Sequence, residues 1–418
     1  MFPDGNRRHR RARMTAVITA IAALAAGCGG QPADPPVMPW QPPPAHPHCG
    51  APVQALGAPQ LQRAYGVPAM LAAGISGTGT TIAVIVPYAN PWVRHDLAVY
   101  SFRYHLPAAR LRVIRYGHVL SAAAGGATGR HWAREGTEDL EMAHALAPGA
   151  ALAYIEVTDN PLVMYDRALS WTVAHVRPDV VSYSSGTPES GGLPGARAGL
   201  EAAARAGVSV VAAAGDTGAT APASYTTLLR SRAVLWPASD PLATAVGGTW
   251  LHVDAVGRRV RPDTAWSNAG GSTAGGAGHS AFFPRPAWQD SIRAVASGHR
   301  AIADVSMDGS ECSPGVIYQQ AQPPAGWDTT QGTSMSTPLL AALIAAAAQA
   351  AGHRLGLLGP ALYTLHGTAD GLLDVTQGND SIPGMPGWAA RPGYDLPTGI
   401  GTVAAALPFV TALARAAS

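Results

Sequence analysis

Short apolar runs separated by helical stretches constrain the fold of this 418-residue chain more than any other feature. Four such runs are Thr80–Val86 (TTIAVIV), Ala151–Thr158 (ALAYIEVT), Asp179–Ser184 (DVVSYS) and Val208–Ala214 (VSVVAAA). They are almost continuously apolar, which is typical of strands that are covered on both faces. Between the last two runs, Ala196–Ala206 (ARAGLEAAARA) predicts a helix. This order predicts an α/β fold with a doubly wound, mostly parallel sheet and helices on both faces, in which ligands bind at the carboxyl ends of the strands.

The first 27 residues predict an export signal. Several arginines precede a 13-residue apolar run, Met14–Ala26, which is too short to span a bilayer and is typical of a signal peptide. The run leads into LAAGC (Leu24–Cys28), which resembles a bacterial lipobox. We therefore expect residues 1–27 to be removed and Cys28 to be acylated, which gives an extracytoplasmic, membrane-anchored lipoprotein. Ordinary secretion and a cysteine without this role are the alternatives.

Residues 28–50 predict a linker and residues 51–418 a single domain. Eight prolines between Gln31 and His48 favour an extended spacer over a packed element. If Cys28 is acylated, Cys49 and Cys312 remain, and in an exported chain we expect them to form a disulfide. Two unpaired thiols are the alternative.

The charge balance argues against a polyanionic partner. Removing five arginines and Asp4 with the first 27 residues leaves 23 Arg against 25 Asp and Glu, a net charge of −2. A chain so close to neutrality gives no electrostatic reason to expect nucleic acid as a partner. We expect a monomer.

The segment GTSMSTP, Gly332–Pro338, predicts a nucleophile. It precedes a strongly apolar helical stretch, Leu339–Ala351, so the Ser334 hydroxyl would lie near the positive end of a helix, where backbone N–H groups can meet a developing oxyanion. A helix-capping serine is the alternative. A serine nucleophile also needs a base within hydrogen-bond reach.

A carboxyl group stands where a subtilisin would have its His, and the position of the subtilisin Asp holds no acidic residue. The first strand runs into Ile85–Tyr88 without an Asp, and the position of the subtilisin HGT segment reads EGT, beginning at Glu135. Glu135 and Asp139 would share one face of a helix. Two carboxyls that close tend to share one proton, which suits one as a base and the other as its orienting partner. A solvated acidic helix start, with Glu138 and Glu141, is the alternative.

A third acidic residue, Asp216, follows the strand Val208–Ala214. At the carboxyl end of a strand it is an ordinary turn residue. Beside a serine nucleophile, a protonated Asp216 could instead donate a hydrogen bond to an oxyanion.

These residues, with other segments in the same order, resemble the sedolisin family of serine-carboxyl peptidases, which have a subtilisin-like fold. The resemblance covers nearly everything from about Pro59 to Ala405. Its motifs are Glu135-x-x-x-Asp139 leading into AHALAPGA, SYSSGTPE (Ser182–Glu189), AAAGDTGA (Ala212–Ala219), WPASDPLATAVGGT (Trp236–Thr249), AWSNAGG (Ala265–Gly271), FPRPAWQ (Phe283–Gln289) and GTSMS.

The resemblance implies a peptidase domain over residues 51–418 that hydrolyses peptides or denatured proteins at acidic pH. It implies Ser334 as the nucleophile, Glu135 as general base and acid, Asp139 as the group that orients Glu135, and Asp216 as the oxyanion donor. Ser184, Ser185 and Gly186 would form the edge with which an extended substrate pairs.

The resemblance also implies one structural Ca²⁺ near the C-terminus. Its ligands would be Asp374, the Val375 carbonyl, the carbonyls of Arg391 and Gly393, and Asp395. Two carboxylates with backbone oxygens suit calcium chemically. Without the resemblance, Asp374 and Asp395 would be read as ordinary turn residues.

Some features depart from the family pattern. We expect no long prosegment. Ser185 stands where the family usually has an aromatic residue, and Pro87 stands where some members have an auxiliary Glu. Two other functions remain as alternatives: a subtilisin-like enzyme that uses His131 or His144 as its base, and a surface binding protein that keeps the fold without turnover.

Overall fold

The computed structural model describes residues 37–39, 49, 53, 55–160, 163–190, 196–224, 226–268 and 271–417. They belong to one compact unit, Pro35–Ser418. The expected signal peptide and Cys28 lie outside the described residues.

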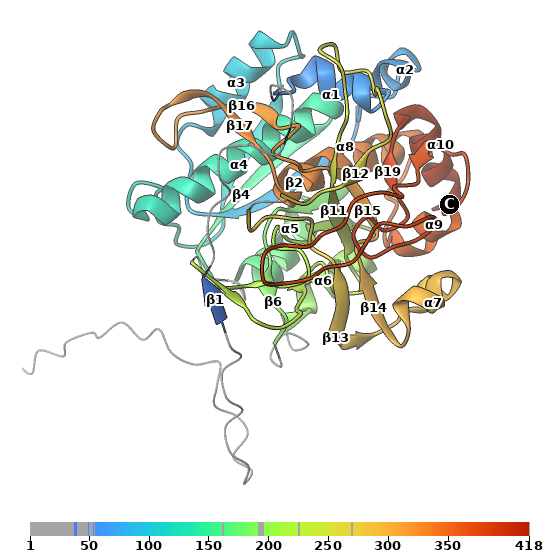
Figure 1. Cartoon of the computed structure of the whole chain (residues 1–418). Coiled ribbons are helices and arrows are strands. Elements are labelled where there is room, and N and C mark those ends of the chain that lie inside the picture. Colours follow the sequence, from blue (N-terminus) through green and yellow to red (C-terminus); the bar gives the residue numbers. More distant parts are fainter. Residues whose placement is uncertain are drawn as a thin grey trace, which may run out of the picture. The chain divides into compact units, whose positions relative to one another are not determined.

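A ten-stranded sheet forms the centre of this unit (Figure 1). Its strands, in spatial order, are β18 (Leu372–Leu373), β19 (Thr402–Val403), β15 (Val305–Asp308), β11 (Thr244–Trp250), β7 (Ser209–Ala213), β5 (Val180–Tyr183), β2 (Thr81–Pro87), β4 (Ala151–Val157) and β3 (Arg110–Arg115), with β12 (Thr264–Ala265) beside β11. From β3 to β19 all neighbours are parallel, whereas β18 and β12 pair antiparallel. The α/β fold with a doubly wound, mostly parallel sheet is therefore confirmed.

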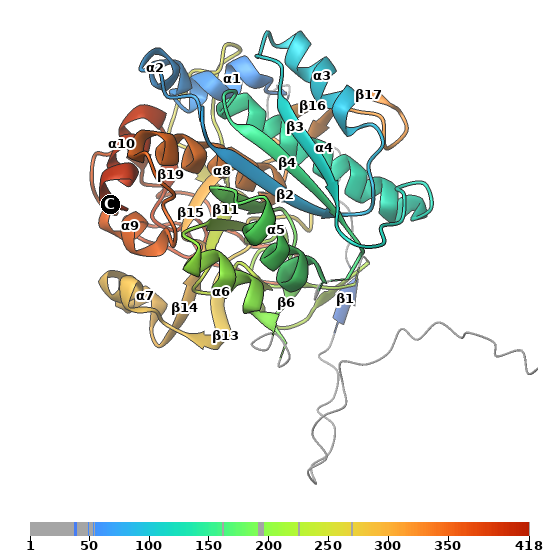
Figure 2. The ribbon, with the colours of Figure 1, turned by 180° about the vertical axis from the view of Figure 1, so that it is seen from behind.

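Helices cover both faces of the sheet (Figures 1 and 2). They are α1 (Ala58–Ala64), α2 (Val67–Ala72), α3 (Val93–Arg103), α4 (Gly126–Leu146), α5 (Leu169–His175), α6 (Ala198–Arg205), α7 (Arg293–Ala296), α8 (Thr333–Ala351), α9 (Gly359–Thr364) and α10 (Ala406–Ala416), with a π-helix at Val163–Ala168 and a 3₁₀-helix at Ala287–Ile292.

The apolar strands are buried on both faces because their side chains alternate. In β2, Ile82, Val84 and Val86 belong to the core under α4 and α8, whereas Ala83 and Ile85 belong to the core under α5 and α6. A strand with apolar neighbours on both sides has no polar face. This explains the continuous runs in the sequence.

Helix α8 is long and apolar enough to cross a membrane, but 78% of its apolar window is buried inside the fold. It packs against α4 across the central part of the sheet. It is therefore a core helix.

Small sheets surround the central one. They pair β1 (Val37–Pro39) with β9 (Thr227–Leu229) and β8 (Pro222–Ser224), β10 (Leu235–Trp236) with β6 (Thr187–Pro188), β13 (Gly278–Pro284) with β14 (His299–Ile302), and β16 (Gly315–Gln319) with β17 (Gly326–Thr330).

The expectation of a spacer without packed elements was wrong for residues 37–39, because they form β1, antiparallel to β9. β1 is an edge strand, where a proline that cannot donate a ladder hydrogen bond is tolerated. Cys49 and Cys312 form a disulfide, which ties the start of the domain to the loop between β15 and β16.

Candidate active site

The predicted catalytic side chains come from three separate parts of the fold, and the predicted substrate-binding residue Ser184 comes from a fourth. Ser334 is the second residue of α8, Glu135 and Asp139 lie on α4, and Asp216 follows β7. Ser184 follows β5. The strands end at the same edge of the sheet, where parallel strands place their ligand sites. The long-range packing of α4 against α8 brings the acidic pair to the serine.

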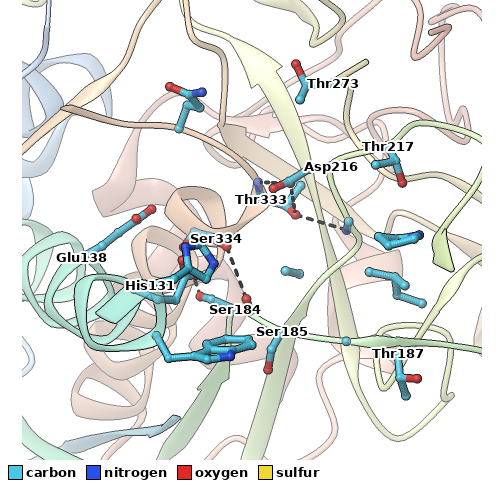
Figure 3. A pocket seen from close by; sticks show the side chains of 18 of the residues that line it. His131, Glu138, Ser184, Ser185, Thr187, Asp216, Thr217, Thr273, Thr333 and Ser334 are labelled. Atoms are coloured by element: carbon cyan, nitrogen blue, oxygen red, sulfur yellow. Dashed lines mark hydrogen bonds between the residues drawn. The ribbon is translucent and has the colours of Figure 1, made fainter. Parts of the chain in front are cut away.

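A cavity of about 720 Å³ opens at this edge (Figure 3). Glu135, Asp216 and Ser334 all line it. Asp139 lies beneath this lining and is 1% exposed. The predicted substrate edge also borders the cavity, through Ser184, Ser185, Gly186 and the following strand β6.

Helix α4 reaches the site because it packs closely on the sheet, over strands β2 and β4. Gly136 follows Glu135, and a Cβ at this position would collide with the hydroxyl of Tyr154 on β4. A larger residue would push the helix away from the sheet, since overpacking of this kind costs about 1–3 kcal/mol. The glycine of the EGT segment therefore sets how close Glu135 can come to the sheet.

The acidic pair is buried. Glu135 is 6% exposed and Asp139 1%. Glu135 Oε1 and Asp139 Oδ2 have no hydrogen-bond partner among the residues that the structure describes. Burial, together with the charge of Asp216, raises the pKa of Glu135 to about 7, although Ser334 and Arg134 act in the opposite direction. Burial and the charge of Glu135 raise the pKa of Asp139 well above its usual range.

The nucleophile and the acidic pair are connected through Ser184. The Ser334 hydroxyl donates to the Ser184 carbonyl at 3.3 Å, and the Ser184 hydroxyl donates to the Ser334 carbonyl at 3.1 Å. The Ser184 hydroxyl is also hydrogen-bonded to Asp139 Oδ1. The Ser334 carbonyl is available because the residue four positions later is Pro338, which has no N–H to donate to it.

A hydroxyl carries a single proton, so Ser184 cannot donate to Asp139 and to Ser334 at once. When Ser184 donates to the Ser334 carbonyl, Asp139 must supply the proton of the Ser184–Asp139 bond. The raised pKa of Asp139, caused first by burial, favours that protonated form. Ser184 thus links Asp139 to the backbone of the nucleophile.

Asp216 is held against the first turn of α8 (Figure 3). Its Oδ1 accepts hydrogen bonds from the Thr333 N–H at 2.7 Å and the Thr333 hydroxyl at 2.8 Å. Gly332 allows this approach, because its φ is +100° and a Cβ there would lie 2.7 Å from Asp216 Oδ2. With Oδ1 occupied by donors, Oδ2 is the oxygen that can carry a proton. Burial raises the pKa of Asp216 above its usual range.

The alternative of a solvated acidic helix start does not hold for the neighbouring glutamates. Glu138 and Glu141 are 1% and 0% exposed. Glu141 accepts from the Tyr318 N–H at 2.9 Å. Glu138 lines the cavity and lies 3.4 Å from Arg134 Nη1. Arg134 also binds Asp328 on β17, so these side chains fasten α4 to the hairpin that precedes the nucleophile.

The two histidines proposed as alternative bases lie in different places. His131 lines the cavity, and burial lowers its pKa. His144 lies near the far end of α4, where its Nε2 is 2.9 Å from the Pro107 carbonyl oxygen. Among the described residues, His144 is not part of the cavity lining.

The predicted calcium ligands lie together in the C-terminal loops. Asp374 follows β18, and its Oδ2 accepts from the Gly393 N–H at 2.8 Å. Asp395 accepts from the Arg391 N–H at 2.8 Å. Burial, with a contribution from the charge of Asp374, raises the pKa of Asp395 to about 6. Two neighbouring carboxyls next to one loop are a donor set that fits a hard cation.

Within the described residues, no cluster of three or more His, Cys, Asp or Glu side chains is placed to hold a metal ion. A site built on Asp374 and Asp395 would therefore depend on backbone carbonyls for its remaining ligands. The expected ligand set has this composition.

The site combines a subtilisin-type serine at a helix start with carboxyl groups in place of an imidazole. A model of the subtilase family matches residues 117–362. Kumamolisin from a Bacillus species is 33% identical over 360 residues, which cover 80% of this chain and 61% of kumamolisin. Sedolisin from a Pseudomonas species is 32% identical over 175 residues, covering 41% of this chain and 29% of sedolisin. The chain thus spans less than two thirds of the length of these relatives.

A solved structure agrees on the fold. Pseudomonas sedolisin, described as a serine-carboxyl proteinase complexed with two molecules of pseudo-iodotyrostatin, superimposes with a TM-score of 0.72 at 23% identity, over 85% of this chain and 97% of that chain. The fold is thus subtilisin-like. The chain belongs to the sedolisin family, within the subtilases.

Proposed function

We propose that this protein is an extracytoplasmic serine-carboxyl peptidase that hydrolyses peptides or denatured proteins at acidic pH. The observation that carries the proposal is the buried Glu135–Asp139 pair beside Ser334, with Asp216 on the other side of the helix start. The membership of the sedolisin family supports the same reaction.

In the proposed reaction, Ser334 Oγ attacks the carbonyl carbon of the scissile bond while Glu135 takes its proton. Asp216 Oδ2–H donates a hydrogen bond to the oxyanion that forms. Glu135 then returns the proton to the leaving amine, the C–N bond breaks, and an acyl-enzyme remains. Water hydrolyses the acyl-enzyme with Glu135 again as the base. Asp139 orients Glu135 and shares its proton.

The substrate would lie along Ser184–Gly186 in an extended conformation. Backbone pairing to this segment supplies affinity without requiring a particular side chain. Ser185 is held from the other side by the Tyr165 hydroxyl at 2.9 Å, so the edge is fixed before a substrate arrives. Its position beside Ser334 would place the scissile carbonyl at the nucleophile.

The pH dependence of hydrolysis tests this mechanism. Asp216 donates only while protonated, so activity should fall as pH rises through its raised pKa. The acidic pair acts as a base only while it has lost one proton, so activity should also fall at very low pH. We expect kcat/KM on an unfolded protein to peak at acidic pH, above the range of ordinary carboxyl pKa values because burial raises the pKa of Glu135, and to be several-fold lower at about pH 7.5. A maximum near neutral pH would show that Asp216 does not act as the donor.

We further propose that the protein is exported and anchored through an acylated Cys28, and that it acts as a monomer. The signal-like residues 1–27 and the disulfide both support an oxidising compartment outside the cytoplasm.

We also propose that Asp374, Asp395 and the carbonyls of Val375, Arg391 and Gly393 hold one structural Ca²⁺. The ion would neutralise the two carboxylates and cross-link the loop after β18 to the loop that carries Asp395. We expect a calcium chelator to lower the melting temperature by several degrees, because an ion that binds only the folded state stabilises it by mass action. Added Ca²⁺ should restore it in wild type but not in Asp395→Asn. An unchanged melting temperature in the chelator would count against the site.

A further inference from the structure

A further carboxyl group, Glu311, lies beneath the site and outside the motifs that carry the sedolisin resemblance. It belongs to the loop between β15 and β16 and is 0% exposed. Its Oε2 accepts a hydrogen bond from the indole N–H of Trp266 at 2.6 Å. Trp266 is 1% exposed and forms part of the cavity wall. Glu311 therefore fixes the position of Trp266, a side chain that lines the active-site cavity.

The loop that carries Glu311 is fixed to the nucleophile segment. The Gly309 carbonyl accepts from the Gly332 N–H at 2.8 Å, and the Asp308 carbonyl accepts from the Ser336 hydroxyl at 2.9 Å. The next residue after Glu311 is Cys312, which forms the disulfide. A carboxyl carried by such a loop has little freedom to move away from the site.

Trp266 and Asp216 are held by consecutive backbone groups. The Ala274 N–H donates to the Asp216 carbonyl at 3.0 Å, and the Gly275 N–H donates to the Trp266 carbonyl at 3.1 Å. Glu311, Trp266 and Asp216 thus form one connected unit.

The charge of Glu311 also acts on Asp216. Burial is the largest cause of the raised pKa of Asp216, the Thr333 hydrogen bonds oppose it, and the charge of Glu311 raises it further. The other charged groups that interact with Asp216 are Glu135 and Glu138 on α4, whose pKa values the Asp216 charge raises in turn. Glu311 is the charged neighbour that raises the pKa of Asp216, and an acidic neighbour favours the protonated form of the carboxyl group beside it.

We propose that Glu311 is a positioning residue for the oxyanion donor: it fixes Trp266 in the cavity wall and, through its negative charge, keeps the proton on Asp216. This inference rests on the proposed peptidase function. It gives Glu311 a role that extends the working range of the enzyme toward higher pH.

The test compares the pH profiles of kcat/KM for wild type and Glu311→Gln on an unfolded protein substrate. The glutamine keeps the chain length and an acceptor for the Trp266 indole but removes the charge. We expect the alkaline limb to move to lower pH by roughly half to one unit, while kcat at the acid optimum changes less than about twofold. In an Asp216→Asn background, where no proton is needed at this position, Glu311→Gln should no longer move the limb.

Glu141→Gln is the matched control, because Glu141 is equally buried but binds the Tyr318 N–H on β16 and, among the described residues, is not part of the cavity lining. The alkaline limb of the pH profile of kcat/KM for Glu141→Gln should match that of wild type. If Glu311→Gln does not fold, Glu311→Met, which fills a similar volume without charge, takes its place. A limb that stays in place in the folded Glu311 variant overturns this proposal alone, whereas an inactive wild type would instead count against the peptidase function.

Discussion

Ser334→Ala is expected to abolish peptide hydrolysis, with a loss in kcat of about 10⁴-fold or more. The serine hydroxyl would form the covalent intermediate, and among the described residues of the cavity no cysteine could replace it. The measurement is release of new amino termini from a denatured protein at acid pH, with wild type and variant compared at equal folded concentration.

Ser231→Ala serves as the control for this experiment, because Ser231 is exposed and lies outside the cavity lining among the described residues. It should retain full activity. If wild type itself releases no product but binds the denatured protein, the alternative of a silent surface binding protein is correct. If Ser334→Ala remains active, the hydrolysis belongs to another nucleophile or to a contaminant.

Glu135→Gln is expected to lower kcat by about 10³–10⁴-fold, because the amide cannot accept the proton from Ser334. The substitution preserves the size of the side chain, so the cavity should keep its shape and KM should change little. The measurement is single-turnover hydrolysis at the wild-type optimum, where acyl-enzyme formation can be followed directly.

Histidine variants provide the comparison for Glu135→Gln. His144→Ala should retain activity once it is shown to be folded, since His144 binds the Pro107 carbonyl away from the cavity. His131→Ala should lose much less activity than Glu135→Gln, although His131 lines the cavity. Activity that survives Glu135→Gln but disappears in His131→Ala would favour a subtilisin-like mechanism.

The fold could be predicted from the sequence because its strands are buried on both faces. The runs at residues 80–86, 151–158, 179–184 and 208–214 correspond to β2, β4, β5 and β7. Burial of this kind leaves a local pattern in the residues themselves. The helix expected at residues 196–206 is found as α6, Ala198–Arg205. By contrast, β1 could not be predicted, since three residues with a proline carry no strand pattern.

The candidate site could be predicted only in part. Ser334 and the Glu135–Asp139 pair stand in short motifs with a chemical signature. The burial of Glu138 and Glu141 was not predicted, because it depends on the β16–β17 hairpin lying over α4. The helical spacing places Glu138 on the same face as Glu135, but it does not reveal whether that face is exposed to solvent.

Long-range contacts explain the remaining gaps. Ser184 was expected to pair with substrate, yet its hydroxyl also connects Asp139 to the Ser334 carbonyl, across 150 residues of sequence. The Glu311–Trp266 bond spans 45 residues. Neither contact has a local sequence signal, because each partner is an ordinary polar residue until the fold brings it to the other.

The disulfide between Cys49 and Cys312 has a consequence for the proposed peptidase, because a peptidase can cut its own chain. It closes a covalent ring across 263 residues, and Glu135, Asp139 and Asp216 all lie inside that ring, whereas Ser334 lies outside it. A single nick inside the ring therefore cannot release a fragment. The two new chain ends stay joined through the disulfide, at a high effective concentration of one for the other. Glu135, Asp139, Asp216 and Ser334 therefore remain covalently linked after such a cut. After such a nick, a piece of the ring can diffuse away only if a second cut is made inside the ring or the disulfide is reduced.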